Sequence, residues 1–561
     1  MLVCGLSALR ADTVTLKDGT KIEGIIVMRT DTQLVLKQGG TTRVIGMDDV
    51  GSMSKVERAV ADPTSPRVRA MAHTPTSILP VAPVSLDDPV ANSTVKVFTT
   101  VSVPDVRKPW AKLPPREETG SGFVIAGKRI LTSAHVIEYA TDIQIRANQA
   151  GDKIPARVVA IDMSFDLAVL KLDDDTFFDA HAALSPISVI PRTREIVQAY
   201  GYSEDSSNVT VLNPSVTTVD FAPYNAQGSG LMVKLNSELA PGTSGGPVTQ
   251  GLGNVMGIAC CRKLGGKTFS FVIPSSEIET FLQGISKGPF LGKPKIYDQL
   301  QKLENPALRE YLGLDRTRHG VVVTSSVTKD GLSLLDWDVL TGIMGDQIDD
   351  QGTVPFTVYR VNFAYDLQIF GFSNLEHADG FVIRGGQERR LSIPLVRKRP
   401  MLIPDLDGAT PSYFVFGPIV FSTVTSQVIS FISSFGQLEA LLSLRGSPLV
   451  TRRTEIPSFP GEQLVFVPAP FFPHKLVRGY DDPTFTVVKA VNGIPIRNLN
   501  HLVQVLRDSK DEFVTMEFFE KGTEIIVFSR TEMIAATDGI LSDNNIRSQG
   551  SADTMAVWNA K

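Results

Sequence analysis

Cysteine is scarce in this chain, with only three among 561 residues. Cys4 lies close to the N-terminus, whereas Cys260 and Cys261 are adjacent and cannot bond to each other without straining the backbone. This pattern argues against a disulfide framework. The fold must therefore be stabilised by its hydrophobic cores.

Long apolar runs and blocks of basic charge are missing as well. No segment approaches the roughly 18 consecutive apolar residues that a membrane-spanning helix requires, so no integral membrane segment is expected. The formal net charge is −5 and no Lys/Arg block stands out, which argues against a nucleic-acid partner.

Histidines at metal-ligand spacing are also absent. One histidine belongs to a motif described below, and the other six are assigned to the surface or the core. No metal site and no other cofactor is therefore expected. These six residues are His73, His181, His319, His377, His474 and His501.

The N-terminal segment Met1–Ala11 resembles the end of a secretory signal, because an apolar stretch closes in Ala-Leu-Arg-Ala. The usual basic opening is missing, the apolar stretch is short, and Leu9 is an unfavourable residue three positions before the cut. A translation start placed too far downstream explains the first two faults. The alternative is an apolar N-terminus that packs on the first domain. We expect an exported protein, located in a bacterial periplasm.

The composition is that of an ordinary globular protein, with 42% hydrophobic and 20% charged residues. Val, Ile, Thr, Phe and Gly recur in short runs broken by turn residues, which predicts a mainly β fold. Asp18-Gly19 and Gly39-Gly40 separate alternating strands and indicate a small Sm/SH3-like barrel at residues 12–56, for protein binding, assembly or stabilisation. Residues 57–92 are rich in proline and predict an extended linker.

The most informative motif is Gly242-Thr243-Ser244-Gly245-Gly246-Pro247, a serine in a glycine-rich turn. His135 lies upstream in Leu131–Val136, and Asp166 lies between the two at the start of an apolar run. The order His, Asp, Ser is that of chymotrypsin-like double barrels and differs from the orders in subtilisins and α/β-hydrolases. Residues 93–286 therefore predict a chymotrypsin-like double β-barrel with serine endopeptidase activity.

Each member of this predicted triad has a chemical role. Ser244 attacks the scissile carbonyl, and His135 accepts its proton and later protonates the leaving amine. Asp166 fixes the imidazole tautomer and stabilises the imidazolium. Three other carboxylates compete for the last role, and Asp166 is preferred because it opens the apolar segment Leu167–Leu170. The competitors are Asp162, Asp173 and Asp174.

The same turn predicts an oxyanion hole. Backbone N–H groups of Gly242 and Ser244 are the expected donors, with that of Thr243 close by. One such donor contributes about 2.7–4 kcal/mol to the transition state of acyl transfer. Glycines in the turn permit the φ angles that this conformation requires.

Two further β-rich modules follow, at residues 287–404 and 408–540, and a C-terminal tail is expected at 541–561. In the second module, the strand Phe485–Val491, an Asn-Gly turn, the helix Asn500–Arg507 and the strand Phe513–Phe519 succeed one another. That succession is typical of a PDZ fold. The first module shares its rhythm, so the two are predicted to be a diverged PDZ-like pair.

The chain resembles the Deg/HtrA family of serine proteases, and in its later part the plant-type Deg branch. The resemblance implies ATP-independent degradation of unfolded or damaged protein. It also implies homo-oligomers built on trimers, often hexamers, with PDZ domains that bind peptide C-termini or lock the assembly. The segments that carry it are Gly120–Ile125, Leu131–Val136, Asp166–Leu172, Gly242–Val248, Phe269–Pro274, Leu303–Arg309, Asp350–Phe356, Val491–Gly493, Asn498–Leu502 and Ile540–Ile546.

Several positions depart from the family pattern. Thr243 and Ser133 stand where asparagines are usual, and neither side chain takes part in the triad chemistry. The substrate-pocket strand reads Phe269-Ser270-Phe271, a bulkier wall that predicts cleavage after small or medium apolar residues such as Ala, Val or Leu. In the first PDZ-like module, Tyr297 replaces an expected glycine and Asp298 follows it. Both changes oppose capture of a peptide carboxylate.

Two other functions remain open at this point. One is a chaperone or binding scaffold with a latent or misassembled triad, favoured by the large share of β modules outside the predicted protease domain. The other is a signalling protease of narrow specificity, which uses the same triad.

Overall fold

The structure is a computed structural model, and it describes residues 12–29, 33–38, 41–46, 49–54, 88–225, 227–251, 253–264, 267–286, 292–327, 333–371, 376–397 and 399–560. The predicted leader at 1–11 and the predicted linker as far as residue 87 lie outside the described residues. The chain divides into two compact units, Met1–Pro80 and Val81–Lys561.

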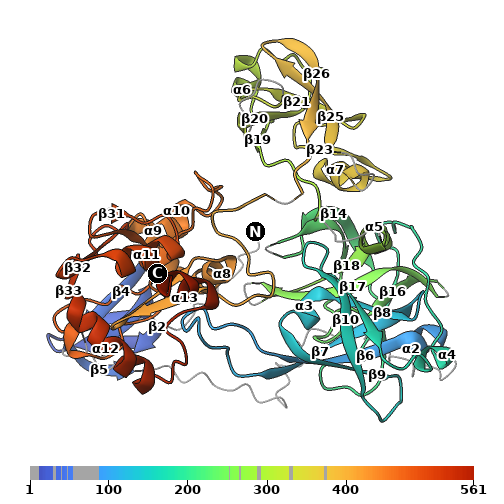
Figure 1. Ribbon diagram of the computed structural model, residues 1–561. Coiled ribbons are helices and arrows are strands. Elements are labelled where there is room, and N and C mark those ends of the chain that lie inside the picture. The colour runs from blue at the N-terminus through green and yellow to red at the C-terminus, as the bar shows by residue number, and fades with distance from the viewer. Residues whose placement is uncertain are drawn as a thin grey trace. The chain divides into compact units, whose positions relative to one another are not determined.

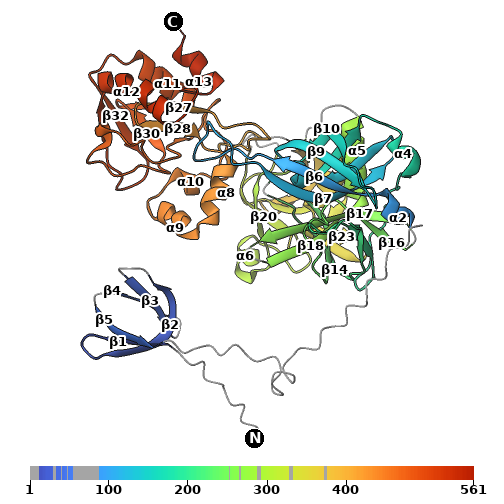
Figure 2. The same cartoon turned by 90° about the horizontal axis from the view of Figure 1, so that it is seen from below.

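The first unit holds five antiparallel strands in the order β4-β3-β2-β1-β5, drawn in blue in Figure 2. The Asp18-Gly19 turn joins β1 to β2, because Gly19 adopts φ +87° and Thr20 N–H donates to the Asp18 carboxylate at 2.8 Å. Val14, Ile22 and Ile45 form its small core. The strands are β1 (Asp12–Leu16), β2 (Lys21–Arg29), β3 (Gln33–Gln38), β4 (Thr41–Gly46) and β5 (Val50–Ser54).

The last residues of the predicted linker form helix α2 (Pro89–Ser93) instead of a tether. The Asp88 carboxylate caps this helix by accepting from Val90 N–H at 2.9 Å and Ala91 N–H at 3.2 Å. Val90 and Ala91 are buried. Proline at the first helical position is compatible with this start, so a Pro-rich composition did not exclude a helix here.

Six strands close into a barrel in the order β10-β11-β8-β7-β6-β9. The predicted strand Leu167–Leu172 is observed as β11 with these bounds, and alternate residues of the neighbouring strands fill the interior. A short helix, α3 (Ala134–Ile137), follows β8 directly. The strands are β6 (Thr94–Val101), β7 (Arg116–Ile125), β8 (Arg129–Ser133), β9 (Ala140–Ala147), β10 (Ile154–Asp162) and β11.

The second half of the double barrel is a seven-stranded sheet, in which the short strand β13 extends the edge at β12. The order is β13-β12-β16-β17-β18-β15-β14, and an isolated bridge between Ile196 and Ser215 connects the two ends. Helix α4 (Phe177–Ala180) precedes this sheet and α5 (Ser275–Ser286) follows it. The strands are β12 (Gln198–Gly201), β13 (Thr210–Leu212), β14 (Val216–Pro223), β15 (Ser229–Leu235), β16 (Pro247–Gln250), β17 (Asn254–Leu264) and β18 (Lys267–Pro274).

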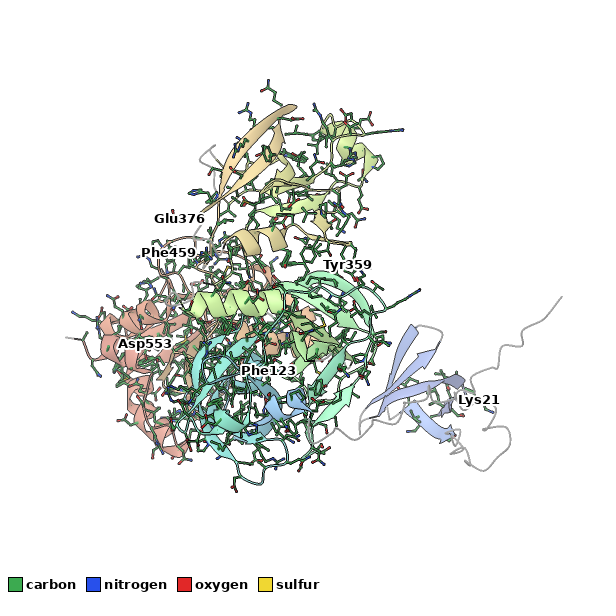
Figure 3. All side chains as sticks on the ribbon, turned by 90° about the vertical axis from the view of Figure 1, so that its right-hand side faces the viewer. Lys21, Phe123, Tyr359, Glu376, Phe459 and Asp553 are labelled. Atoms are coloured by element: carbon green, nitrogen blue, oxygen red, sulfur yellow. The ribbon has the colours of Figure 1, made fainter. Side chains whose placement is uncertain are left out.

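One hydrophobic cluster joins the two halves of the double barrel (Figure 1). Phe123 from β7, labelled in Figure 3, and Leu131 from β8 are fully buried there. Val255 from β17 and Phe281 from α5 belong to the same cluster. Because residues of both halves share one core, the two halves pack against each other as one unit.

The next module is built on the sheet β19-β20-β21-β25-β26, with β22 paired to β21. Asn305 caps α6 by accepting from Ala307 N–H at 2.9 Å, so this helix begins at Pro306. The elements are β19 (Gln299–Lys302), α6 (Pro306–Tyr311), β20 (Val321–Ser325), β21 (Val339–Ile343), β22 (Asp346–Gln347), β23 (Thr353–Phe356), β24 (Tyr359–Asn362), α7 (Ala364–Gly371), β25 (His377–Arg384) and β26 (Gln387–Pro394).

The C-terminal module contains the sheets β27-β28-β29 and β31-β30-β32-β33. The predicted tail is in fact packed here, because the Trp558 ring lies 5.2 Å from the ring of Phe414 and 5.8 Å from that of Phe416. The elements are β27 (Tyr413–Phe416), β28 (Ile419–Thr423), α8 (Ser426–Ser434), α9 (Gly436–Leu444), α10 (Pro448–Thr451), β29 (Val465–Phe466), η2 (Lys475–Val477), β30 (Val488–Val491), β31 (Ile494–Pro495), α11 (Leu499–Asp508), β32 (Phe513–Phe518), β33 (Ile526–Ser529), α12 (Arg530–Asp543) and α13 (Ala552–Trp558).

Among the described residues, no single helix is long and apolar enough to cross a membrane. Helices α8 and α9, bent by 109° at their junction, meet the length and composition criteria only as a pair. Val428, Ile432 and Leu442 of this pair are buried in the hydrophobic core of the C-terminal module.

Asp366 on α7 predicts a pH dependence of stability. Its buried Oδ2 has no hydrogen-bond partner among the described residues, and burial, with a smaller effect of Asp346, raises its pKa from 3.8 to about 7. The folded chain thus holds a proton that the unfolded chain has released, so its stability falls as the pH rises from about 4 to about 7. Asp366→Asn is expected to flatten this decline.

Thermal unfolding measured across that pH range tests the expectation. Asp379→Asn is the matched control, because Asp379 is exposed and pairs with Arg390 at 2.7 Å. An unchanged slope in Asp366→Asn, or an equal change in Asp379→Asn, contradicts the assignment.

Candidate active site

Strand pairing brings the predicted base and its carboxylate together. His135 lies on α3 immediately after β8, and Asp166 lies immediately before β11. Strands β8 and β11 are antiparallel neighbours in which Ser133 pairs with Leu167. The residues that follow Ser133 and precede Leu167 therefore meet at the same end of the barrel.

Asp166 forms hydrogen bonds with both the backbone and the side chain of His135. Its Oδ1 accepts the backbone N–H of His135 at 3.0 Å, and the two carboxylate oxygens lie 2.9 and 2.7 Å from His135 Nδ1. Asp166 is fully buried, whereas the His135 side chain is 25% exposed. Burial raises the pKa of Asp166, but the charge and hydrogen bonds of His135 outweigh it, and the pKa lies below its ordinary value. Asp166 is therefore an ionised partner that receives Nδ1–H.

The competing carboxylates have other partners. Asp162 accepts from Ser164 N–H at 2.7 Å, and burial raises its pKa. Asp173 pairs with Arg157, and Asp174 accepts from Thr176 N–H. In the described part of the chain, the only carboxylate within hydrogen-bonding distance of His135 is that of Asp166. The structure thus brings together the pair that the sequence preferred.

Asp166 contacts His135 from an unusual backbone conformation, because its φ is positive at 55°. Aspartate tolerates the left-handed region better than most residues, because its short side chain can bond locally. Here Asp166 N–H donates to Met163 O at 3.3 Å, and Ala134 N–H donates to Asp166 O at 3.0 Å. The backbone on both sides of the carboxylate is thereby held in place.

Ser244 occupies the loop between β15 and β16 and is 5% exposed. Its Oγ accepts the backbone N–H of Cys261 at 2.9 Å. Among the described residues, no hydrogen bond joins Ser244 to His135. In the predicted triad the serine would have to rotate away from β17 to reach His135, and catalytic hydrogen bonds are often formed only once substrate is bound.

Two of the three predicted oxyanion donors are free to bind a ligand. The third, the N–H of Thr243, is not available to a ligand, because it donates to Ala240 O at 3.1 Å in a tight turn. The N–H groups of Gly242 and Ser244 have no partner within the described ranges. Gly242 has φ +91° and Gly245 has φ +93°, which glycine adopts without strain.

Sequence reasoning missed Ser121, which holds the glycine-rich loop that is predicted to form the oxyanion hole. Its Oγ donates to Gly242 O at 2.8 Å and accepts Tyr202 N–H at 2.9 Å, while its N–H donates to Ser244 O at 2.8 Å. Ser121 is fully buried. The Gly-Ser-Gly segment was noticed, but only the tertiary fold shows that its serine holds the peptide groups on both sides of Thr243.

Ser121→Ala is expected to lower kcat by about 10²-fold with little change in KM, similar to loss of one oxyanion donor, because the Gly242 peptide is no longer held. Steady-state kinetics on an ester substrate measures both constants. Ser93→Ala is the control, since Ser93 is a buried serine whose Oγ donates to Ala182 O away from this loop. A proportional rise in KM, or an equal loss in the control, contradicts a positioning role.

The three residues predicted to form the substrate pocket do not lie on one side of β18. Phe271 is 3% exposed and stacks on Tyr224 within the core, with ring centres 5.9 Å apart. Ser270 faces the other way, accepts Leu239 N–H at 2.7 Å, and pairs across the strands with Cys261. Phe269 is 50% exposed. Ser270, through its cross-strand partner Cys261, is therefore on the side of β18 nearer Ser244, because Cys261 N–H donates to Ser244 Oγ.

Cys260 is a second contact of Asp166 that sequence reasoning missed. Its Sγ lies 3.4 Å from Asp166 Oδ2, and both residues are fully buried. Burial, together with the charge of Asp166, raises the pKa of this thiol well above its ordinary value. Cys260 is thus a protonated thiol that donates a weak hydrogen bond to the carboxylate.

Two stretches of the chain match known domain families. Residues 120–258 match the trypsin-like peptidase domain, and residues 404–553 match the PDZ domain. These matches confirm the predicted mainly β fold with a chymotrypsin-like domain and a C-terminal PDZ domain.

Two proteins of Arabidopsis thaliana are similar to this chain in sequence. "Protease Do-like 2, chloroplastic" is 30% identical over 476 residues, which are 83% of this chain and 76% of that protein. "Protease Do-like 4, mitochondrial" is 28% identical over 485 residues, 83% of this chain and 86% of that protein. Among solved structures, "HtrA-type protease AlgW with decapeptide" is 21% identical with a TM-score of 0.42, over 56% of this chain and 100% of that chain.

Proposed function

The chain belongs to the Deg/HtrA family of serine proteases and is a serine endopeptidase, and on that premise we propose that it degrades unfolded or damaged proteins without ATP. The catalytic residues of this proposal are Ser244, His135 and Asp166. The observation that carries it is the buried Asp166 carboxylate at 2.7 Å from His135 Nδ1, next to the loop of Ser244.

The geometry supports a specific division of labour. Because Asp166 receives Nδ1–H, the lone pair of His135 lies on Nε2 and accepts the proton of Ser244. The serine oxygen attacks the peptide carbonyl, and the N–H groups of Gly242 and Ser244 stabilise the oxyanion. His135 then protonates the leaving amine, and water repeats the sequence on the acyl-enzyme. None of these steps requires a nucleotide.

The decisive experiment compares unfolded and folded substrates. Purified full-length protein is incubated without ATP with reduced, carboxymethylated lactalbumin and with the native, disulfide-bonded form of the same protein. We expect rapid degradation of the unfolded form only, and no degradation by Ser244→Ala. Cleavage of both forms at one site supports a signalling protease of narrow specificity and contradicts a quality-control role.

We also propose that the substrate pocket accepts small or medium apolar residues. Two residues near Ser244 support this. The Ser270 hydroxyl already accepts Leu239 N–H, and the Cys261 thiol is apolar in character. A peptide library should be cleaved mainly after Ala, Val or Leu. Ser270→Gly should widen the acceptance toward larger residues by about tenfold, the usual effect of a small change in pocket volume. Cleavage after Lys or Arg contradicts the proposal.

The first β-rich module, residues 287–404, is proposed as a PDZ-like domain that serves assembly or regulation. Two contacts support this reading of its altered loop. Asp298 Oδ1 already accepts Val327 N–H at 2.9 Å, and the guanidinium of Arg399 lies 5.0 Å from the Tyr297 ring. An internal carboxylate thus lies in the loop where a peptide carboxylate would bind, and it is held there by a backbone donor that follows β20.

Members of the family act on protein substrates and typically oligomerise. We propose a trimer-based homo-oligomer for this chain, which sedimentation analysis can measure. Export to an extracytoplasmic compartment stays a proposal that rests on the leader-like segment 1–11. The Arabidopsis thaliana relatives are named chloroplastic and mitochondrial, and they give no support to a bacterial periplasm.

The second candidate function is a chaperone with a latent triad. It is favoured by the bond between Ser244 Oγ and Cys261 N–H, which turns the nucleophile away from His135. Labelling with a fluorophosphonate distinguishes the two functions, since only an activated serine reacts. No labelling, even with unfolded protein present, together with suppression of aggregation by Ser244→Ala, would establish the chaperone.

A further inference from the structure

The donor atoms of His135, Asp166 and Cys260 form a compact set of nitrogen, oxygen and sulfur ligands. One donor atom from each residue lies within 4.8 Å of the others. Zn²⁺ holds nitrogen and oxygen at about 2.0–2.2 Å and thiolate at about 2.3 Å in a tetrahedron, so its ligand atoms lie about 3.3–3.7 Å apart. In the structure Asp166 Oδ2 lies 2.7 Å from His135 Nδ1 and 3.4 Å from Cys260 Sγ. Small side-chain movements therefore suffice to place all three donors on one ion.

We propose that this set is an inhibitory site for a thiophilic divalent cation, with Zn²⁺ as the reference ion. The inference rests on the proposed triad for its effect on activity. His135 lies on α3, Asp166 immediately before β11, and Cys260 on β17. Because these segments are far apart in the sequence, no ligand spacing predicts the site. A fourth position is left for water or for substrate, as in other zinc sites with three protein ligands.

Binding changes the protonation of the triad in a defined way. The Cys260 thiol releases its proton to solvent and binds as thiolate, while Asp166 binds as carboxylate. The proton on His135 Nδ1 is replaced by the metal, and the neutral ring carries its proton on Nε2. A ring that is protonated on Nε2 cannot accept the proton of Ser244. The metal therefore inhibits by fixing the wrong tautomer of His135.

The geometry also separates Cys260 from its neighbour. Successive residues of a strand face opposite sides, so Cys260 points to Asp166 while Cys261 Sγ lies 3.8 Å from Ala240 O. Only the first thiol reaches the triad carboxylate. The half-buried ring of His135 is the exposed member of the set and marks the side from which an ion enters.

Full-length wild type, Cys260→Thr and Cys261→Ser are titrated with Zn²⁺ in thiol-free buffer, and each rate is normalised to the same variant without metal. Threonine keeps a hydroxyl donor for Asp166 but removes the soft ligand. Fluorophosphonate labelling of wild type and Cys261→Ser is expected to fall about tenfold when free Zn²⁺ is about ten times its Kd, and to recover with EDTA. Cys260→Thr should show no such fall.

Cd²⁺ binding gives a readout that does not depend on activity, through the ultraviolet absorbance of a cadmium–thiolate bond. We expect this band in wild type and Cys261→Ser, and its loss in Cys260→Thr. Equal inhibition of Cys260→Thr, or loss of the band in Cys261→Ser alone, overturns the proposal. Absence of labelling in metal-free wild type counts against the proposed triad, and the cadmium band then still decides whether the metal site exists.

Discussion

Asp166→Asn is expected to lower kcat by about 10⁴-fold, the effect of a wrong histidine tautomer in this class of enzyme. The backbone N–H of His135, which is bonded to Asp166 Oδ1 at 3.0 Å, orients the new amide with its oxygen at that position. The amide NH₂ then faces His135 Nδ1, where Oδ2 lies at 2.7 Å in the wild type. Nδ1 must accept instead of donate, so the proton moves to Nε2 and the base is lost.

Single-turnover kinetics on an activated ester, together with the rate of fluorophosphonate labelling, measures this loss at the chemical step. Ser244→Ala supplies the background rate, and Asp162→Asn is the matched control because Asp162 bonds to Ser164 and not to His135. A loss of less than about tenfold would mean that Asp166 does not set the tautomer in the working enzyme. An equal loss in Asp162→Asn would mean that general destabilisation is responsible.

Lys293→Met is expected to destabilise the protease domain by about 3–5 kcal/mol, the usual cost of removing one partner of a buried ion pair. Lys293 Nζ is fully buried, lies 2.8 Å from Glu277 Oε2 and donates to Ser229 O at 2.9 Å. It also lies 4.1 Å from the centre of the Phe165 ring, one residue before Asp166. Methionine fills similar space but leaves the Glu277 carboxylate buried without its cation.

Denaturant unfolding followed by tryptophan-independent far-ultraviolet circular dichroism measures the change, and the transition of the protease domain is fitted separately because the chain has several domains. Lys302→Met is the control, since Lys302 is exposed. The double variant Lys293→Met/Glu277→Leu should recover most of the lost stability, because no charge is then left unpaired. A cost below about 1 kcal/mol for Lys293→Met, the range of an exposed pair, contradicts the assignment.

Local sequence patterns predicted much of the fold, because the spacing of apolar residues and the capping residues favour particular strands and helices. The run Leu167–Leu172 is apolar at every position except Lys171 and is observed as a strand with those bounds. Helix Asn500–Arg507 has the periodicity of an amphipathic helix and is observed as α11 with Asn498 as its cap. The tail at 541–561 was misjudged, since its anchor, Trp558, packs on Phe414, a partner far away in sequence.

The predicted substrate-pocket residues also depend on information that the local sequence does not contain. Phe269-Ser270-Phe271 was treated as one wall, although alternate residues of a strand face opposite sides. The burial of Phe271 against Tyr224 decides which side is the core. Once that side is known, Ser270 and its cross-strand partner Cys261 follow as the residues beside the nucleophile.

The sequence by itself determined the serine protease class and which residues are proposed as its triad, because a serine in a glycine-rich turn and the order His, Asp, Ser require only local motifs and their succession. The tertiary structure decided how those residues are held. Ser121 reaches Gly242 across 121 positions of the chain, and Cys260 reaches Asp166 across 94. Contacts of that span arise only when two barrels pack against each other, and no local propensity encodes them.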